Sequence, residues 1–143
     1  MTYENYIKAK LVDLAVLEAF HMGGTASMCA VAQVIANRVR SGWGEWNHVI
    51  NTAAKFRGTI PPQQGDFDPK DLTFRQFLTM VDDIYHGTAD DTNVNLEDDR
   101  GALVSLYYAE LHSIDNDWFR KEIAGNHERH PRIAVVGQLT FFG

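Results

Sequence analysis

The stretch Tyr6-Ile-Lys-Ala-Lys-Leu-Val-Asp-Leu-Ala-Val-Leu-Glu-Ala-Phe20 decides the first element of the fold, because its apolar residues recur at helical spacing. Ile7, Leu11 and Leu14 form one stripe, and Glu18 continues that stripe within a narrow arc of the helix. We therefore expect the Glu18 side chain to point toward the core, where loss of hydration raises the pKa of a carboxyl group. A general acid needs such a pKa near neutral pH, so Glu18 is the leading catalytic candidate.

A second interpretation of Glu18 stays open at this point. The residue lies near the end of the expected helix, where an acid can turn back to solvent or pair with Arg38 or Arg40. Single acids on apolar stripes are common, so the pattern alone slightly favours this interpretation.

The first 41 residues predict two helices separated by a pair of glycines. The first helix runs from about residue 5 to residue 20 and stops near Gly23-Gly24, where two glycines in a row break helical order. Thr25 or Ser27 offers a cap for the second helix, which runs from residue 28 to about residue 41. Apolar side chains cover several sides of this second helix, which is typical of a central helix.

Polar residues on the second helix are confined to one strip. Gln33, Asn37 and Arg40 follow each other at spacings of four and three residues, so they share a face. Trp43 and Trp46 then flank a glycine in a turn, and we expect them to close the end of the helix.

Further along the chain, two more helical segments are predicted around a long loop. A short amphipathic stretch spans residues 48–54, and residues 57–71 form a loop rich in Gly, Pro, Gln and Asp. A third helix spans residues 73–86, with Thr73 as its cap and Gly87 at its end. Its expected inner face consists of Phe74, Phe77, Leu78, Val81 and Ile84.

The C-terminal part of the chain predicts the β structure. Residues 88–96 form a polar loop, and residues 99–111 fit either a helix or a strand. Residues 132–143 are β-branched and aromatic on both sides of a glycine, which is typical of two short strands or a hairpin. The predicted fold is α+β and mainly helical, with a small C-terminal β element in a single domain over residues 1–143.

Composition limits the expected cofactors and partners. The 143 residues include 45% hydrophobic residues, enough to bury a sizeable core, and carry a formal net charge of -6. An acidic average surface repels nucleic acid and anionic membranes, so neither is an expected partner. The single cysteine, Cys29, lies in an apolar run and is expected to be a buried, inert thiol. The six histidines lack ligand spacing with cysteine, and we expect no metal and no organic cofactor.

The N-terminal residues give no sign of a targeting segment. The first six residues, Met1-Thr-Tyr-Glu-Asn-Tyr6, lack the basic start of a signal peptide and no apolar stretch of the required length follows them. No later segment reaches membrane-spanning length by sequence. We therefore expect a chain that is made in the cytoplasm without a signal peptide and does not insert into a membrane.

Two blocks of the chain resemble a known family. Residues 14–19, a glycine-bearing turn and then Ala30-Val-Ala-Gln-Val-Ile-Ala-Asn-Arg-Val39 are similar to the motif of the cell-wall hydrolases related to the spore cortex-lytic enzyme SleB. In that family, a helix ending in Glu-Ala leads through a Gly-rich turn into Ala-Val-Ala-x-Val-x-x-Asn-Arg-Val. Weaker similarities follow in the same order at Lys55-Phe56, Gly101-Ala102, Tyr107-Tyr108, Asp117-Trp118 and residues 136–142. The resemblance thus spans nearly the whole chain, with gaps.

The resemblance implies a compact, lysozyme-like domain that acts on peptidoglycan. Members of the family cleave the glycan between N-acetylmuramic acid and N-acetylglucosamine as lytic transglycosylases, and their catalytic acid is a glutamate at the end of the first helix, the position of Glu18. One carboxyl group suffices, because the 6-hydroxyl of muramic acid attacks its own anomeric carbon while the glutamate changes from acid to base. Helix phase and resemblance therefore agree on Glu18.

Hydrolytic glycosidases need a second carboxylate, and the sequence does not provide one near Glu18. Asp13 lies about 140° around the helix from Glu18. Glu110, Asp115 and Asp117 are expected to be loop or surface charges.

Sugar binding needs flat apolar surfaces for the ring faces and amide or hydroxyl partners for the polar groups. The predicted substrate-binding residues are four aromatic side chains and three amides: Phe56, Tyr107, Tyr108, Trp118, Gln33, Asn37 and Gln138. Core packing explains the aromatic residues equally well, and Asn37 is also explained as a tie between two backbone segments.

The chain departs from the family pattern at two positions that bear on the site. Met22 stands where the family turn carries a second glutamate, and Leu139 stands where the family carries a histidine. Loss of the histidine removes a pocket hydrogen bond, which puts substrate preference in question. His21 follows Glu18 by one turn and is expected to face solvent.

A wall-degrading domain without an export signal suggests a phage lysin, a component carried in a virion or injection machine, or a fragment of a larger exported protein, and the phage setting is the first expectation. We expect it to act at the bacterial cell wall, with peptidoglycan strands and other virion or lysis proteins as partners. The main alternative is a catalytically silent, lysozyme-like module that binds glycan or serves as a structural part of a phage particle or secretion apparatus. A muramidase that uses water is a third interpretation.

Overall fold

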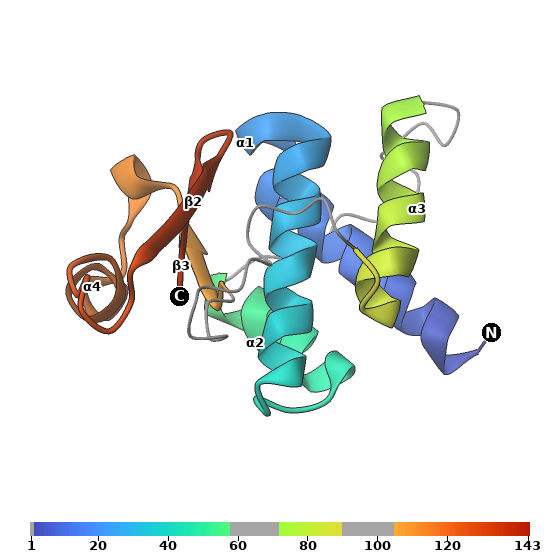
Figure 1. Cartoon of the computed structure of the whole chain (residues 1–143), viewed down its shortest axis with the longest axis horizontal. Helices are drawn as coiled ribbons and strands as arrows, with labels where there is room; N and C mark the ends of the chain where they lie inside the picture. The colour runs from blue at the N-terminus through green and yellow to red at the C-terminus, as the bar shows by residue number, and fades with distance from the viewer. Residues whose placement is uncertain (1, 58–71, 90–104) are drawn as a thin grey trace.

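The computed structural model describes residues 2–57, 72–89 and 105–143. The long helices of these ranges are α1 (Tyr3–Arg40), α2 (Trp46–Arg57) and α3 (Leu72–His86). The strands are β1 (Tyr107–Ala109), β2 (Arg132–Val136) and β3 (Leu139–Phe142), and the short helices η1 (Leu111–Ser113), α4 (Asp117–Phe119) and η2 (Arg120–Ala124) lie between β1 and β2. Figure 1 shows α1 in the middle, with α3 on one side and the sheet on the other. The predicted class, α+β and mainly helical, is confirmed.

Helix α1 is bent at two adjacent glycines. Gly23 and Gly24 have non-helical backbone angles, with φ 162° and ψ 16° for the first and φ 67° and ψ -143° for the second. The positive φ of Gly24 is a conformation that residues with a side chain rarely adopt. The two arms of α1 run in different directions, drawn in dark blue and cyan in Figure 1, so the predicted break is confirmed.

The predicted caps after the break are wrong. Ser27 uses its hydroxyl to donate a hydrogen bond to the carbonyl oxygen of Val136 at 3.0 Å. The hydroxyl oxygen of Thr25 is buried and has no hydrogen-bond partner within the described ranges. Packing against the C-terminal hairpin therefore takes the place of a local cap at this helix start.

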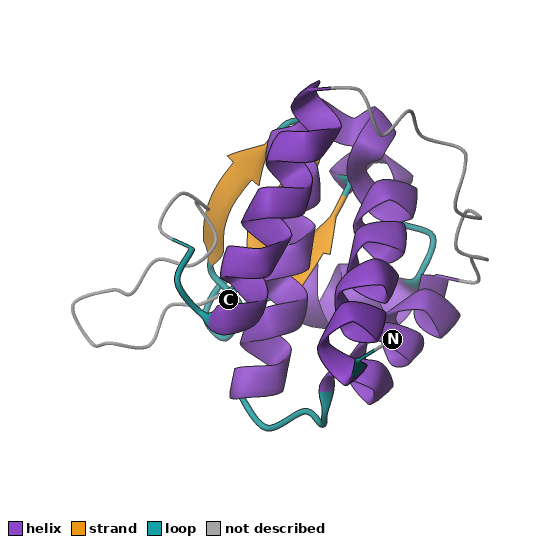
Figure 2. Ribbon diagram, turned by 90° about the vertical axis from the view of Figure 1, so that its right-hand side faces the viewer, coloured by secondary structure: helices purple, strands orange, loops and turns teal. Residues whose placement is uncertain are grey.

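The second arm of α1 is the centre of the core. Every residue from Ser27 to Asn37 is buried, and the arm shares one apolar cluster with α2, α3 and the sheet. Figure 2 shows the strands behind the helices, and Figure 1 shows this arm, in cyan, with α3 on one side and the sheet on the other. The prediction of a central helix is confirmed. Cys29 lies in this arm, and burial raises the pKa of its thiol to about 12, which makes it the inert thiol expected from the sequence.

The C-terminal residues form an antiparallel sheet with the strand order β1-β3-β2. Val136 pairs with Leu139 across a tight turn, and Gly137 in that turn has a φ of 60°. The predicted hairpin is therefore confirmed. The alternatives for residues 99–111 are decided in favour of strand at β1, while residues 99–104 lie outside the described ranges.

The turn between β2 and β3 is seated against the kink of α1. Gly137 and Gly23 approach so closely that a Cβ atom on Gly137 would lie 2.2 Å from the carbonyl oxygen of Met22. The same carbonyl accepts a hydrogen bond of 2.6 Å from the backbone N–H of Gln138. The absence of side chains on both glycines lets the helix kink and the hairpin touch, which fixes the end of the first arm relative to the sheet.

Helices α2 and α3 cover the other side of α1. The buried residues of their inner faces are Val49, Ile50, Ala53, Phe77, Val81 and Ile84. Leu78 was expected on the inner face but is 41% exposed, because it lies about 100° around the helix from the buried Phe77. Helix α3 begins one residue before Thr73, which therefore lies inside the helix and not at its cap. Gly87, with a φ of 78°, ends the helix as predicted.

Several further sequence predictions fall outside the described part of the chain. They concern the side chain of Phe74, the loop over residues 58–71 and the part of the polar loop after residue 89. The prediction of a single domain over residues 1–143 stays a prediction for the same reason.

Helix α1 also bears on the expectation that no segment can span a membrane. Of the helices in the described ranges, it alone is long and apolar enough to do so, with a mean hydropathy of 1.3 in its best window. Half of that window is buried inside the fold, and core helices pass the same test. The expectation that the chain does not insert into a membrane therefore stays a prediction.

Candidate functional site

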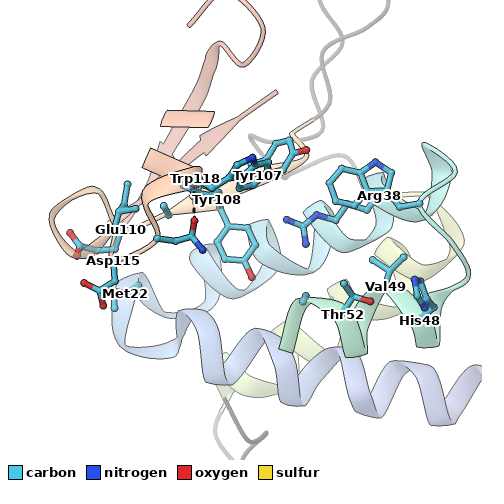
Figure 3. A pocket seen from close by; sticks show the side chains of 16 residues that line it. Met22, Arg38, His48, Val49, Thr52, Tyr107, Tyr108, Glu110, Asp115 and Trp118 are labelled. Carbon is cyan, nitrogen blue, oxygen red and sulfur yellow. Dashed lines mark hydrogen bonds between the residues drawn. The ribbon is translucent and has the colours of Figure 1, made fainter. Parts of the chain in front are cut away.

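A groove of about 560 Å³ lies where α1, α2 and the segment from β1 to α4 meet. Figure 3 shows Met22, Glu110 and Asp115 at one end of it, Val49, Thr52 and His48 at the other, and Tyr108 and Arg38 between them. The lining side chains belong to Met22, Arg38, Trp43, His48, Val49, Thr52, Ala53, Tyr107, Tyr108, Ala109, Glu110, Ile114, Asp115, Asn116, Trp118 and Phe119. Most of this lining is apolar or aromatic, which suits the ring faces of a sugar.

Glu18 lies directly behind the wall of this groove. Its side chain is half-buried, with Oε1 shielded from solvent, so the direction predicted from helix phase is confirmed. Oε2 accepts a hydrogen bond of 2.8 Å from the hydroxyl of Tyr108. Glu18 is not itself a lining residue of the groove, whereas Tyr108 is. The carboxyl group is thus one hydrogen bond away from the groove surface.

The position of Tyr108 follows from the register of the sheet. β1 pairs with β3 so that Tyr108 lies opposite Phe141, and their ring centroids are 5.9 Å apart. Only 4% of Tyr108 is exposed, because its ring packs into the apolar core cluster that α1 shares with the sheet. A buried phenol needs a hydrogen-bond partner, and the carboxylate of Glu18 provides one.

An aromatic surface forms part of the groove wall. Trp118 is 53% exposed and Trp43 is 41% exposed, which is unusual for such large apolar side chains. Tyr107 lies next to Trp43, with ring centroids 5.5 Å apart. Trp118 and Tyr107 were predicted to bind substrate, and both line the groove. Trp43 was expected only to close a helix; the signal that could have found it is a tryptophan between two glycines, where little can cover the ring.

Two of the predicted amides lie in the core and not on the groove. Gln33 is fully buried and donates from Nε2 to Oδ1 of Asn37 at 2.9 Å. Asn37 is 1% exposed and donates from Nδ2 to the carbonyl oxygen of Ser105 at 2.9 Å. Asn37 therefore ties α1 to the segment before β1, and Gln33 bonds to Asn37 within the core. Arg40, the third residue of the predicted polar strip, instead donates to the carbonyl oxygen of Ile84 in α3 at 3.3 Å. Direct sugar binding by Gln33 and Asn37 is a wrong prediction for this structure.

The remaining two predicted binding residues also lie away from the groove lining. Gln138 is exposed in the β2–β3 turn, where its backbone, and not its side chain, bonds to α1. Phe56 belongs to α2, and its side chain lies outside the described part of the chain. Of the predicted binding residues, Tyr107, Tyr108 and Trp118 are thus brought together by the fold.

Charged side chains of opposite sign line different parts of the groove. Glu110 and Asp115 lie at one end, although the sequence had suggested mere loop or surface charges. Glu110 also accepts a hydrogen bond of 3.0 Å from the backbone N–H of His112, which holds its side chain at the start of η1. The positively charged Arg38 lies between this end and the end at Val49 and Thr52. Sequence spacing could not reveal this arrangement, because it depends on how the segment after β1 folds back.

The positions that depart from the family pattern have different environments. Met22 lines the groove. Leu139 is 1% exposed in β3 and contributes to the core in place of a polar group. His21 is exposed, as predicted, and its ring lies 5.0 Å from that of Phe20.

No protein-family model, no curated protein and no solved structure matches this chain. The resemblance described from the sequence therefore stands on its residues alone. Within the described ranges, no three His, Cys, Asp or Glu side chains gather in a way that could hold a metal ion.

Proposed function

We propose that the chain cleaves peptidoglycan glycan strands as a lytic transglycosylase, with Glu18 as general acid and base. The observation that carries the proposal is the half-buried Glu18 carboxyl group, bonded to a tyrosine of an aromatic groove. The motif around Glu18 and residues 30–39, which resembles cell-wall hydrolases, supports the same assignment. Burial and aromatic walls are the features that a sugar-cleaving acid requires.

The proposed reaction uses one carboxyl group twice. Protonated Glu18 gives its proton to the glycosidic oxygen, and the bond from that oxygen to the anomeric carbon of muramic acid breaks. The 6-hydroxyl oxygen of the same muramic acid bonds to the anomeric carbon and loses its proton to Glu18. The products are a 1,6-anhydromuramoyl end and a free hydroxyl on the leaving sugar, and Glu18 regains its starting state without consuming water.

Tyr108 has a defined part in this proposal. Its hydroxyl donates a hydrogen bond to Oε2 of Glu18. A bound glycosidic oxygen takes that position, so the tyrosine holds the carboxyl group in place until the substrate arrives. Hydrogen bonds of catalytic groups commonly rearrange in this way between the free enzyme and its complex.

The test is a clearing assay on purified peptidoglycan with the native chain and Glu18→Gln. We expect the substitution to lower the rate by about 10²–10⁴-fold, the usual contribution of a general acid. Glu128→Gln, which changes an exposed glutamate outside the groove, is the control and should clear at the native rate. Equal clearing by native protein and Glu18→Gln would show that Glu18 is not the acid.

A second candidate function is a muramidase that uses water. Glu110 and Asp115 favour it, because both line the groove and a hydrolytic enzyme needs a second carboxylate. Mass spectrometry of the products separates the two reactions, since anhydro ends are lighter than reducing ends by one water. Reducing ends, together with loss of activity in Asp115→Asn or Glu110→Gln, would favour hydrolysis.

The alternative without catalysis is a glycan-binding or structural module of a phage particle or secretion apparatus. It predicts that the native chain and Glu18→Gln both bind peptidoglycan and that neither clears it. In either role, the proposed site of action is the bacterial cell wall, with virion or lysis proteins as further partners.

A further inference from the structure

Arg38 is the only arginine or lysine among the described residues that line the groove. Its Nε donates a hydrogen bond of 2.8 Å to the carbonyl oxygen of Leu106, which fixes the plane of the guanidinium group. The guanidinium carbon lies 4.9 Å from the ring centroid of Trp43 and 5.9 Å from that of Tyr108. A permanent positive charge is therefore held rigidly in the aromatic part of the groove, beside the tyrosine that bonds to Glu18.

The positive charge of Arg38 contrasts with the net negative charge of the whole chain. The chain carries 19 acidic and 13 basic residues, so its average surface repels anions. Glu110 and Asp115 add negative charge at one end of the same groove. The cationic side chain and the two carboxylates thus lie at different places along the groove.

We propose that Arg38 binds a carboxylate of the glycan and thereby selects acidic strands over neutral ones. The inference rests on the proposed function. Two parts of peptidoglycan can supply this carboxylate: the lactyl group of muramic acid, or a peptide stem attached to it. A planar guanidinium pairs with a carboxylate through two parallel hydrogen bonds, which a neutral N-acetylglucosamine polymer cannot form.

The test measures binding in the Glu18→Gln chain, so that no probe is cleaved. The probes are chitotetraose, a peptide-free tetrasaccharide of alternating N-acetylglucosamine and N-acetylmuramic acid, and the same tetrasaccharide with peptide stems, each titrated by calorimetry. We expect the peptide-free acidic probe to bind about tenfold more tightly than chitotetraose. Preference for the stem-bearing probe alone would assign the carboxylate to the peptide.

The deciding variants change Arg38 in this background. Arg38→Gln should reduce the preference to less than about twofold and leave the affinity for chitotetraose nearly unchanged. Arg38→Lys keeps the positive charge but lacks the paired N–H donors of the guanidinium group, so it should retain part of the preference for the acidic probe. Arg129→Gln, which removes an exposed arginine outside the groove, is the matched control and should keep all of it.

Each other outcome overturns the inference. If Arg38→Gln still prefers the acidic probe over chitotetraose, another group binds the carboxylate. If the substitution weakens the binding of both probes equally, Arg38 has only a structural role. If Arg38→Gln does not fold, an undiminished preference in Arg38→Lys decides against the proposal. Failure of the Glu18→Gln chain to bind any of the probes would overturn the proposed glycan function itself, whereas binding without a preference that depends on Arg38 overturns this inference alone.

Discussion

Glu18 and Tyr108 form a hydrogen bond between two residues 90 positions apart in the sequence. Glu18 comes from the first arm of α1 and Tyr108 from β1, so the contact joins the helical part of the molecule to the sheet. It is also the link between the candidate acid and the groove. Its strength therefore bears both on folding and on how the carboxyl group is presented to a ligand.

Tyr108→Phe should lower the free energy of unfolding by about 1–3 kcal/mol, because it removes a buried hydrogen-bond donor and leaves the carboxyl group in place. Urea unfolding at neutral pH measures this loss. A double-mutant cycle with Glu18→Gln should give a coupling between the two residues that is clearly different from zero.

Tyr107→Phe is the matched control for that substitution. It also removes a phenolic hydroxyl in β1, but no hydrogen bond of that hydroxyl is found within the described ranges. The expected change is below about 0.5 kcal/mol. Equal effects of the two substitutions would show that the bond to Glu18 adds nothing specific.

At the scale of elements, the contact between the α1 kink and the β2–β3 turn organises the site. The kink turns the chain soon after Glu18, and Met22 at the kink lines the groove. The hairpin holds that corner through the bond from Gln138 to Met22 and the close approach of Gly23 and Gly137. Glycine is needed at position 137 because the backbone there has a positive φ and because a Cβ atom would clash with the carbonyl oxygen of Met22.

Gly137→Ala should therefore be strongly destabilising. The left-handed backbone costs about 1–2 kcal/mol for a residue with a Cβ atom, and the clash with the Met22 carbonyl adds about 1–3 kcal/mol. The measurement is the midpoint of urea unfolding compared with the native chain.

Gly24→Ala separates the two contributions. Gly24 also has a positive φ, of 67°, but a Cβ atom there would meet nothing within 4 Å. With φ 67° and ψ -143°, its backbone lies in a region that essentially only glycine adopts, so a backbone cost of about 1–3 kcal/mol is expected and no clash is added to it. A loss in Gly137→Ala that is no larger than in Gly24→Ala would contradict the importance of the close approach.

At the scale of the whole molecule, the groove exists because segments from both parts of the chain meet. α1, the turn after it and α2 provide one part of the lining, and residues 107–119 provide the other. Trp43 and Trp118 come from these separate segments, and about half of each side chain is exposed. Exposed tryptophans at the rim of an apolar groove are typical of a ligand site.

Trp118→Ala should weaken glycan binding by about tenfold, equivalent to ~1.4 kcal/mol, since it removes a flat surface for a sugar ring. Thermal stability should stay near the native value, because half of the side chain already lies in solvent. Calorimetry with peptidoglycan fragments in the Glu18→Gln chain measures the affinity.

Tyr6→Ala is the control, because Tyr6 is a 44% exposed aromatic residue outside the groove lining. It should bind glycan as tightly as the parent chain. Loss of affinity in both variants would point to a general effect of removing surface aromatics, and unchanged affinity in Trp118→Ala would exclude this residue from the site.

The sequence by itself determined the features that depend on neighbours along the chain. Helical periodicity gave the inward direction of Glu18, and the Gly23-Gly24 pair gave the break in α1, because both follow from backbone geometry over a few residues. The hairpin over residues 132–142 was equally readable from its β-branched and aromatic residues around a glycine.

The tertiary structure alone decided which distant residues meet. The sequence suggested Gln33 and Asn37 as sugar-binding amides. In the structure, Asn37 bonds to the backbone of Ser105, 68 residues away, and Gln33 bonds to Asn37, so both side chains lie in the core. Arg38, one residue further around the helix, reached the groove instead. Helix phase fixes the direction of a side chain but not what lies opposite it, because that depends on how the whole chain closes around α1.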